Sequence, residues 1–239
     1  MPVNLQAQQW VDGVFDALLP SHCLLCGARG QGRLSLCPDC AADMPRNEIH
    51  CARCALPLAA PAPLCGRCLQ REPPWDAAWA PFRYEWPLAQ LESRFKFGGD
   101  LAAGRTLSLL WMAASRPVEL PQAIVPVPLH RSRLRKRGYN QALELAKPLA
   151  KVLGVSLSHD ALWRNRATGA QTELTAVQRR RNVRGAFATS LDEKPPQHVA
   201  LLDDVFTTGA TLAECTRVLK RAGVPRVDVW ALARAPARV

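Results

Sequence analysis

Eight of the nine cysteines in this 239-residue chain form one regular series between residues 23 and 68. The series consists of four C-x2-C pairs, and ten residues separate each pair from the next. Two thiolates with this spacing can bind one tetrahedral ion, and two such pairs complete a four-cysteine zinc site. The sequence therefore predicts two structural Zn²⁺ ions, with the ligands Cys23, Cys26, Cys37, Cys40, Cys51, Cys54, Cys65 and Cys68.

The cysteine series is also an internal repeat with a period of 28 residues, since His22-Cys23 recurs as His50-Cys51. The simplest pairing is sequential, with the first four cysteines on one ion and the last four on the other, but the spacing alone also allows a crossed pairing. A disulfide framework would require secretion. The first twenty residues contain Asp12 and Asp16 and no basic residue, so they do not resemble a secretory signal. We therefore expect a reducing, cytoplasmic location and no membrane insertion.

A second stretch, residues 199–211, carries the strongest functional signal. Val199 to Leu202 is a continuous apolar run, which is typical of a strand buried on both faces of a parallel sheet. Asp203 and Asp204 follow where such a strand emerges, at the edge where open α/β sheets bind ligands. The next turn offers amides and hydroxyls for an anion at a helix N-terminus. Its residues are Thr207, Thr208, Gly209, Ala210 and Thr211. Together these groups indicate a sugar-phosphate ligand.

Positive charge is concentrated in residues 121–190, which hold thirteen basic and three acidic side chains of a chain with a formal net charge of +11. Such a field favours a polyanionic ligand, whether pyrophosphate, nucleic acid or both. Five cations fall between Arg131 and Arg137, expected as a loop at the same sheet edge as the aspartates. Residues 163–185 lack apolar periodicity and are expected to form a long mobile loop over pyrophosphate or nucleic acid. Its candidate ligand-binding arginines are Arg164, Arg166, Arg179, Arg180 and Arg181.

The overall pattern predicts two domains. Residues 1–73 comprise a short helix and the cysteine repeat, and residues 74–239 form the second domain, with separate cores joined at the proline-rich hinge Glu72–Trp75. In the second domain we expect strands and helices in alternation, which implies a parallel sheet with helices on both faces. Strands are predicted at 79–84, 123–127, 198–203 and 227–233, and helices at 87–97, 101–114, 140–153 and 210–222.

Residues 199–211 resemble the phosphoribosyl-pyrophosphate (PRPP) signature of type I phosphoribosyltransferases, and nearly the whole chain resembles the ComF/GntX family. Beyond the cysteines, the resemblance rests on Phe95-Lys96-Phe97, Val125-Pro-Val-Pro128, Arg137-Gly-Tyr-Asn-Gln141, Arg164-x-Arg166-Ala-Thr168, Gln171 and Arg179-x-x-Asn182. It implies an α/β fold with a type I phosphoribosyltransferase-like parallel sheet flanked by helices and a small N-terminal double zinc ribbon. It also implies a link to natural transformation or the use of external DNA.

The resemblance further implies roles for the site residues. Asp203 and Asp204 would be the catalytic pair at the ribose hydroxyls, the turn 207–211 would hold the 5′-phosphate, and Mg²⁺ would accompany PRPP. Arg137 and the arginines of 163–185 would bind pyrophosphate. Salvage enzymes for oxopurines place an aspartate, as general base, where this chain has Thr207, so that reaction is disfavoured.

Two functions remain open at this point. One is a PRPP-binding protein acting in DNA uptake, with single-stranded DNA and other DNA-uptake proteins as partners. The other is an active phosphoribosyltransferase on an unidentified nucleobase or amine acceptor, unrelated to DNA.

Overall fold

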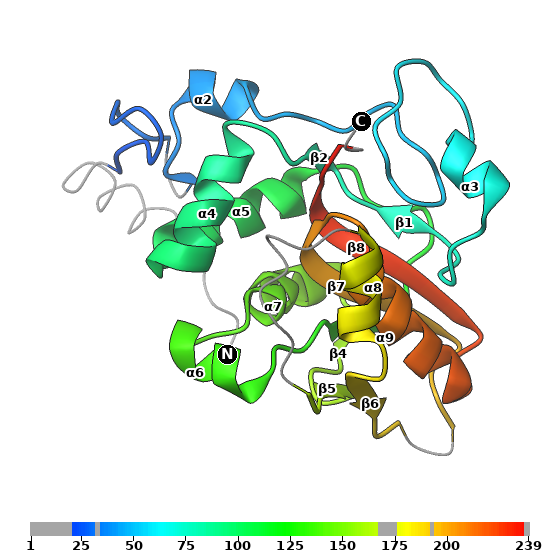
Figure 1. Ribbon diagram of the computed structural model, residues 1–239. Helices are drawn as coiled ribbons and strands as arrows, with labels where there is room; N and C mark the ends of the chain where they lie inside the picture. The colour runs from blue at the N-terminus through cyan, green and yellow to red at the C-terminus, as the bar shows by residue number, and fades with distance from the viewer. Residues whose placement is uncertain (1–20, 32–33, 167–175, 192–193, 237–239) are drawn as a thin grey trace.

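The computed structural model describes residues 21–31, 34–166, 176–191 and 194–236 (Figure 1). The helix predicted near the N-terminus therefore lies almost wholly outside the described residues, as does the middle of the loop predicted at 163–185.

The centre of the molecule is a parallel sheet with the strand order β1-β8-β7-β3-β4, in which β2 also pairs with β8 (Figure 1). All residues of β3 and residues 199–202 of β7 are buried, which explains why these strands are continuous apolar runs. Of the four predicted strands, those at 123–127, 198–203 and 227–233 are confirmed, and the one predicted at 79–84 is divided into two short strands. The strands are β1 (Ala78–Trp79), β2 (Phe82–Arg83), β3 (Ala123–Pro126), β4 (Ser156–Leu157), β7 (His198–Phe206) and β8 (Arg226–Arg234).

Helices cover both faces of this sheet, as predicted. Ala200 and Leu202 pack in one apolar cluster with α4, α5 and α7, whereas Val199 and Leu201 pack in the other with α9. The alternation follows from the two-residue period of a strand. The four long helices are α4 (Leu88–Gly98), α5 (Leu101–Ala113), α7 (Gln141–Leu153) and α9 (Ala210–Arg221), close to the predicted ranges.

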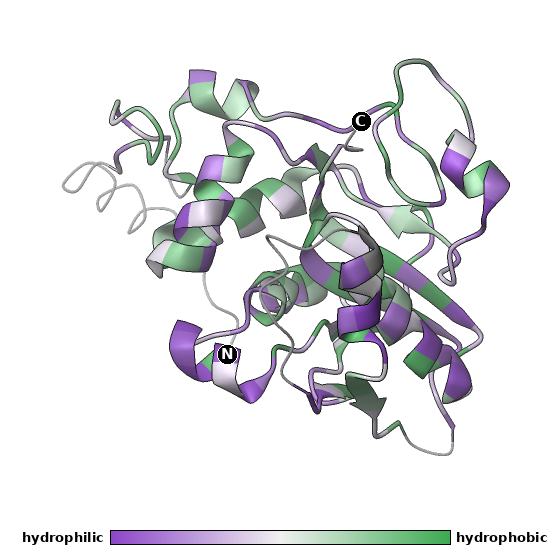
Figure 2. Ribbon diagram, in the orientation of Figure 1, coloured by the Kyte–Doolittle hydropathy of each residue, from purple (hydrophilic) through white to green (hydrophobic). Residues whose placement is uncertain are grey.

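The basic segments differ from the prediction, because both contain regular structure. Residues 131–137 form the helix α6 (Arg131–Arg137), which begins at a His130 cap and ends at Gly138 with φ 86°. Figure 2 shows α6 as mostly hydrophilic. The predicted long loop begins with β5 (Leu162–Arg164), which pairs antiparallel with β6 (Phe187–Thr189). Between them lies α8 (Ala176–Val183), and the following turn is fixed by the Gly185 amide, which donates to Glu214 Oε1 at 2.8 Å.

The zinc-ribbon segment packs directly against the sheet and its helices, so the expectation of separate cores is wrong. Cys51 and Cys54 share one apolar cluster with Trp75 and Phe206, and Cys23 shares the other with Trp111. Trp75 is only 5% exposed, so the proline-rich segment is an anchored connection rather than a free hinge. A ribbon of this size buries too little apolar surface by itself, and the sheet domain supplies the missing contact area. The domain boundary at residue 73 stays a prediction.

Two short helices complete the ribbon, α2 (Pro38–Ala42) and α3 (Gly66–Gln70), and each begins directly after a cysteine. Across the described ranges, no helix is both long and apolar enough to cross a membrane.

Candidate metal centres and sugar-phosphate site

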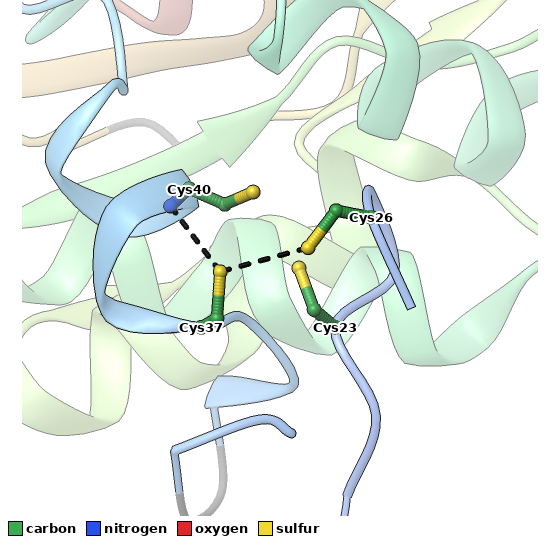
Figure 3. Close-up of side chains that lie close together, drawn as sticks. All are labelled: Cys23, Cys26, Cys37 and Cys40. Carbon is green, nitrogen blue, oxygen red and sulfur yellow. Dashed lines mark hydrogen bonds between the residues drawn. The ribbon is translucent and has the colours of Figure 1, made fainter. Parts of the chain in front are cut away.

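The eight cysteines of the series gather in two groups of four, and the pairing is sequential. Figure 3 shows the first group, in which two sulfur atoms come from the knuckle 23–26 and two from the start of α2. Within each group all sulfur atoms lie within 4.8 Å of one another. The groups are Cys23, Cys26, Cys37 and Cys40, and Cys51, Cys54, Cys65 and Cys68. The crossed pairing is therefore excluded.

The distances between sulfur atoms fit a tetrahedral ion. Cys26 Sγ lies 3.7 Å from Cys37 Sγ (Figure 3), and Cys54 Sγ lies 3.7 Å from Cys65 Sγ. A Zn–S bond of about 2.3 Å gives an S–S edge of about 3.8 Å in a regular tetrahedron. Four sulfur ligands at this spacing match structural Zn²⁺, and the predicted zinc-binding residues are confirmed as two complete ligand sets.

Backbone amides prepare one thiol of each group for metal binding. Although burial opposes it, hydrogen bonds from backbone amides lower the pKa of Cys23 to about 6. The same balance lowers the pKa of Cys51 to about 7. Because the thiolate is the form that binds zinc, these amides favour the metal-bound state before the ion arrives.

The two aspartates of the PRPP-like signature lie near the carboxyl end of β7, within the strand rather than after it. Asp203 Oδ1 accepts a hydrogen bond from the Asp204 amide at 3.0 Å, and Asp204 Oδ1 accepts one from the Val205 amide at 2.7 Å. Asp204 is 7% exposed and Asp203 is half-buried. As successive strand residues they face opposite sides of the sheet. Asp204 faces α4, and Asp203 faces the side covered by α9, where it lies near Cys215.

Lys96 of α4 is a central residue of this site to which the sequence analysis assigned no role. Its Nζ lies 2.9 Å from Asp204 Oδ2 and 2.9 Å from Glu92 Oε1. Glu92 is 1% exposed, and its other oxygen accepts a hydrogen bond from the Tyr84 hydroxyl at 3.0 Å. The available signal was the Phe95-Lys96-Phe97 segment, in which a lysine stands between two aromatic residues on a helix that packs on the sheet.

The charges of the site are unequal. Burial opposes ionisation of Asp204, but the charge and the hydrogen bond of Lys96 outweigh it and hold its pKa below the ordinary value. Burial, reinforced by the Asp204 charge, raises the pKa of Asp203 to about 8. At neutral pH Asp204 is therefore ionised and Asp203 is mostly protonated. A further cation beside Asp203 would favour its ionised form.

The turn that follows β7 fits glycine alone at its last position. Gly209 begins α9 with φ 73°, a left-handed conformation. A Cβ atom there would lie 2.7 Å from the Phe206 ring and 2.9 Å from the Trp75 ring. Thr207 is exposed, and the Thr208 hydroxyl accepts a hydrogen bond from the Ala210 amide at 3.4 Å, beside the N-terminus of a 12-residue helix. Amides and hydroxyls at a helix N-terminus are the donors that an anion requires.

Arg137 is held beside the end of α4. Its Nη1 donates to Gln141 Oε1 at 2.6 Å, and its guanidinium lies 5.6 Å from the centre of the Phe97 ring. Two residues later, the Tyr139 ring stacks on Phe95 at 5.1 Å, and its hydroxyl donates to the Phe95 carbonyl. The segment 137–141 is thereby attached to the helix that carries Lys96. Among the contacts of the described residues, none joins Arg137 to the two aspartates.

The remaining candidate arginines are placed differently from one another. Arg164 is 7% exposed with its guanidinium 5.1 Å from the centre of the Phe187 ring. Arg166 donates from Nη2 to the carbonyls of Asn182 and Arg184 at 3.3 and 2.8 Å, so it closes the end of α8 onto β5. Arg181 is exposed. The side chains of Arg179 and Arg180 lie outside the described part of the structure. A ligand role for these five arginines stays a prediction.

A family model for the double zinc ribbon domain matches residues 14–69, which contain both cysteine groups. Competence protein F of Haemophilus influenzae is 39% identical over 208 residues, which cover 84% of this chain and 90% of that protein. The chain belongs to the ComF/GntX family.

Further ComF/GntX relatives support the same conclusion. DNA utilization protein YhgH of Salmonella typhimurium is 37% identical over 225 residues, covering 90% of this chain and 98% of that protein. Competence protein ComFC of Streptococcus pneumoniae is 25% identical over 232 residues, covering 89% and 99%. The likeness therefore extends well past the zinc ribbon into the sheet domain, and the family predicted from the motifs is confirmed.

Proposed function

We propose that this ComF/GntX protein binds PRPP with Mg²⁺ at the carboxyl end of β7 and acts in the uptake or use of external DNA. The observation that carries the proposal is the arrangement around Asp203 and Asp204. Two carboxyl groups precede the Gly209 turn, where threonine hydroxyls and backbone amides lie at the start of α9. Carboxylates suit ribose hydroxyls and the turn suits a phosphate, so one sugar phosphate satisfies both.

Each group has a distinct task in this proposal. The Thr207–Thr211 turn holds the 5′-phosphate, Asp204 accepts a hydrogen bond from a ribose hydroxyl, and Lys96 keeps Asp204 ionised. Asp203, with its elevated pKa, is the carboxylate best suited to a cation that arrives with the ligand. Mg²⁺ would neutralise the pyrophosphate and would be held by Asp203 directly or through water.

The raised pKa of Asp203 links ligand binding to protons. A magnesium–PRPP complex prefers the Asp203 carboxylate, whereas the free site holds it protonated below a pKa of about 8. Binding should therefore release a proton at neutral pH, and affinity should rise as the pH approaches 8 and level off above it. Calorimetry in buffers of different ionisation enthalpy measures the number of protons released.

Titration calorimetry with PRPP and Mg²⁺ tests the site itself. Asp203→Asn should weaken binding about tenfold to a hundredfold, the usual effect of removing one charge-assisted contact. The matched control is Asp228→Asn, which changes a buried aspartate in the adjacent strand β8, paired there with His198 and Arg226. The proposal is overturned if the wild-type protein shows no binding at millimolar PRPP, or if both variants bind as well as it does.

A role with DNA rests on the names of the relatives and on charge. Competence protein F and DNA utilization protein YhgH are 39% and 37% identical to this chain, and the helix α6 presents a run of exposed cations. The exposed members of this run are Arg131, Arg135 and Lys136. A cationic surface suits single-stranded DNA, whose phosphates supply most of the affinity. Other DNA-uptake proteins are further candidate partners.

The second candidate function is phosphoribosyl transfer to a nucleobase or amine. It requires the same PRPP site and, in addition, an acceptor that displaces pyrophosphate at the anomeric carbon. A pyrophosphate-release assay with PRPP, Mg²⁺ and a panel of nucleobases and amines separates the two functions. Acceptor-dependent release favours the transferase, and PRPP binding without release favours the binding protein.

A further inference from the structure

One buried arginine joins the second zinc group to residues 206–209, the turn between β7 and α9. Arg234, at the end of β8, is 5% exposed. Its Nε donates to the carbonyl of the zinc ligand Cys54 at 2.9 Å. Its Nη1 donates to the carbonyls of Phe206 and Thr207 at 2.8 and 2.7 Å, and to that of Ala235 at 2.6 Å. One guanidinium therefore connects a metal ligand to the first residues of the turn.

A tryptophan makes a second connection, from the Cys51–Cys54 turn to the other end of the 206–209 turn. Trp75 Nε1 donates to the carbonyl of Arg53 at 2.7 Å. The Trp75 ring meets Phe206 edge-on at 5.3 Å between centroids, and its outer edge would lie 2.9 Å from a Cβ on Gly209. The Arg234 guanidinium lies 4.2 Å from the centre of the same Phe206 ring. Phe206 therefore contacts both Trp75 and Arg234.

The carbonyls of Arg53 and Cys54, which accept these hydrogen bonds from Trp75 and Arg234, belong to the tight C-x2-C turn of the second zinc group. Cys51 and Cys54 bound to one ion fix the carbonyls of Arg53 and Cys54, and Ala55 leaves this turn in a left-handed conformation with φ 52°. Without an ion, four clustered sulfur atoms have no common partner, and the turn loses the constraint that holds those two carbonyls in place. Figure 1 shows the end of β8 beside the loop that precedes α3, in agreement with these contacts.

The first zinc group is attached elsewhere. Its knuckle carbonyl at Leu24 accepts a hydrogen bond from Arg94, and the carbonyl of Leu34 accepts one from Thr106 at 2.8 Å. These partners lie on α4 and α5, so among the described contacts of the first group none reaches residues 206–209.

We infer that Arg234 and Trp75 are positioning residues through which zinc at the second site holds the 206–209 turn in its anion-binding conformation. The inference rests on the proposed PRPP site for its functional meaning. The second zinc ion would then be required for ligand affinity as well as for stability of the ribbon, whereas the first would act mainly on stability.

Hydrogen exchange in the full-length, zinc-loaded protein tests this coupling without any ligand. The 28-residue repeat supplies a matched pair of variants, Cys68→Ser at the second site and Cys40→Ser at the first. Peptides covering residues 205–213 should exchange about tenfold faster or more in Cys68→Ser, because local opening of the turn becomes easier. Cys40→Ser should leave the exchange of these peptides unchanged.

Two further variants probe the connecting side chains with the zinc ligands intact. Arg234→Met should accelerate exchange in the same peptides and weaken PRPP binding about tenfold or more. Arg226→Met, at the start of the same strand, is its control. Trp75→Phe keeps an aromatic ring and removes the hydrogen-bond donor to the Arg53 carbonyl. It tests the coupling in place of any variant that fails to fold. Zinc content and circular dichroism are measured for each protein.

These outcomes distinguish the proposed PRPP binding from the coupling between the second zinc site and the 206–209 turn. Failure of wild-type protein to bind PRPP overturns the proposed function, and the exchange data still decide the coupling. Exchange at 205–213 that is equal in wild type, Cys68→Ser and Arg234→Met overturns the inference. Equal acceleration by Cys40→Ser and Cys68→Ser also overturns it, because the effect would not then be specific to the second site.

Discussion

Lys96 is the single residue whose removal should expose the electrostatics of the site most clearly. Lys96→Met keeps most of the side-chain volume and leaves Glu92 and Asp204, which are 1% and 7% exposed, without their shared cation. Breaking a buried ion pair from one side costs about 3–5 kcal/mol of unfolding free energy. In a chain of this size, each kcal/mol shifts the Tm by about 2–4 °C. The Tm should therefore fall by about 6–20 °C.

The pH dependence of this loss follows from the pKa directions. In the wild type, Asp204 has a lowered pKa, so its stabilising contribution is present above its ordinary value of 3.8 and is lost as the pH falls through the lower one. In Lys96→Met the pKa values of Glu92 and Asp204 should both rise, so the variant should be most stable at low pH and should lose stability as the pH increases. The difference in Tm between the two proteins should therefore narrow from pH 7.5 to pH 5.

Thermal unfolding followed by circular dichroism at both pH values is the assay. The control is Lys147→Met, which removes a lysine that pairs with Glu144 at 2.7 Å but whose side chain is 52% exposed. Such exposed pairs contribute about 0–1 kcal/mol, so its Tm should change by about 4 °C or less. Glu92→Gln added to Lys96→Met should recover part of the loss. A Lys96→Met shift no larger than that of Lys147→Met, or one independent of pH, would refute the reasoning.

Three further outcomes are expected. Protein purified without chelator should contain about two zinc ions per chain by elemental analysis, and a zinc content near zero in folded protein contradicts the ligand sets. Asp203→Asn should raise the Tm at pH 8.5 but not at pH 3.5. The pKa of Asp203 is raised to about 8, so the wild-type protein loses stability as the pH rises from 3.8 through 8. Equal Tm shifts at both pH values would contradict that pKa. Replacing Arg131, Arg135 and Lys136 by Gln should weaken the binding of single-stranded DNA at every sequence. It should also lower the slope of log affinity against log salt concentration by up to about 0.7 per lost phosphate contact, as fluorescence anisotropy across a salt series would show. An unchanged slope would exclude α6 from the DNA-binding surface.

The parts of the fold that sequence reasoning predicted are those in which local pattern and burial agree. Residues 199–202 are apolar at every position and form the centre of β7, buried on both faces. The helix α7 ends at Gly154, which adopts φ 67° as a helix-terminating glycine does. The cysteine pairs identified the zinc groups, although only the structure decided between the two pairings.

The parts that were missed depend on contacts between distant segments. Lys96 and Asp204 are paired across more than a hundred residues, and neither position has a local signal for the other. The separate-core expectation was wrong for the same reason, because apolar residues between the cysteines do not indicate which surface they cover. The α6 segment was taken for a loop because a run of charges conceals its helix limits at His130 and Gly138.

The position of β8 in the sheet has a consequence for biosynthesis. Ribosomes make the cysteine knuckles first, yet the strand that pairs with β1, β2 and β7 and carries Arg234 is the last of the described elements to be made. Until β8 emerges, β1, β2 and the Cys54 carbonyl of the second zinc group lack their partners in the sheet. Zinc can therefore be captured early, but the contacts that join the ribbon to the site form only when translation has passed β8. Sequence-distant contacts of this kind slow folding. Zinc bound early keeps reactive thiolates occupied throughout that delay.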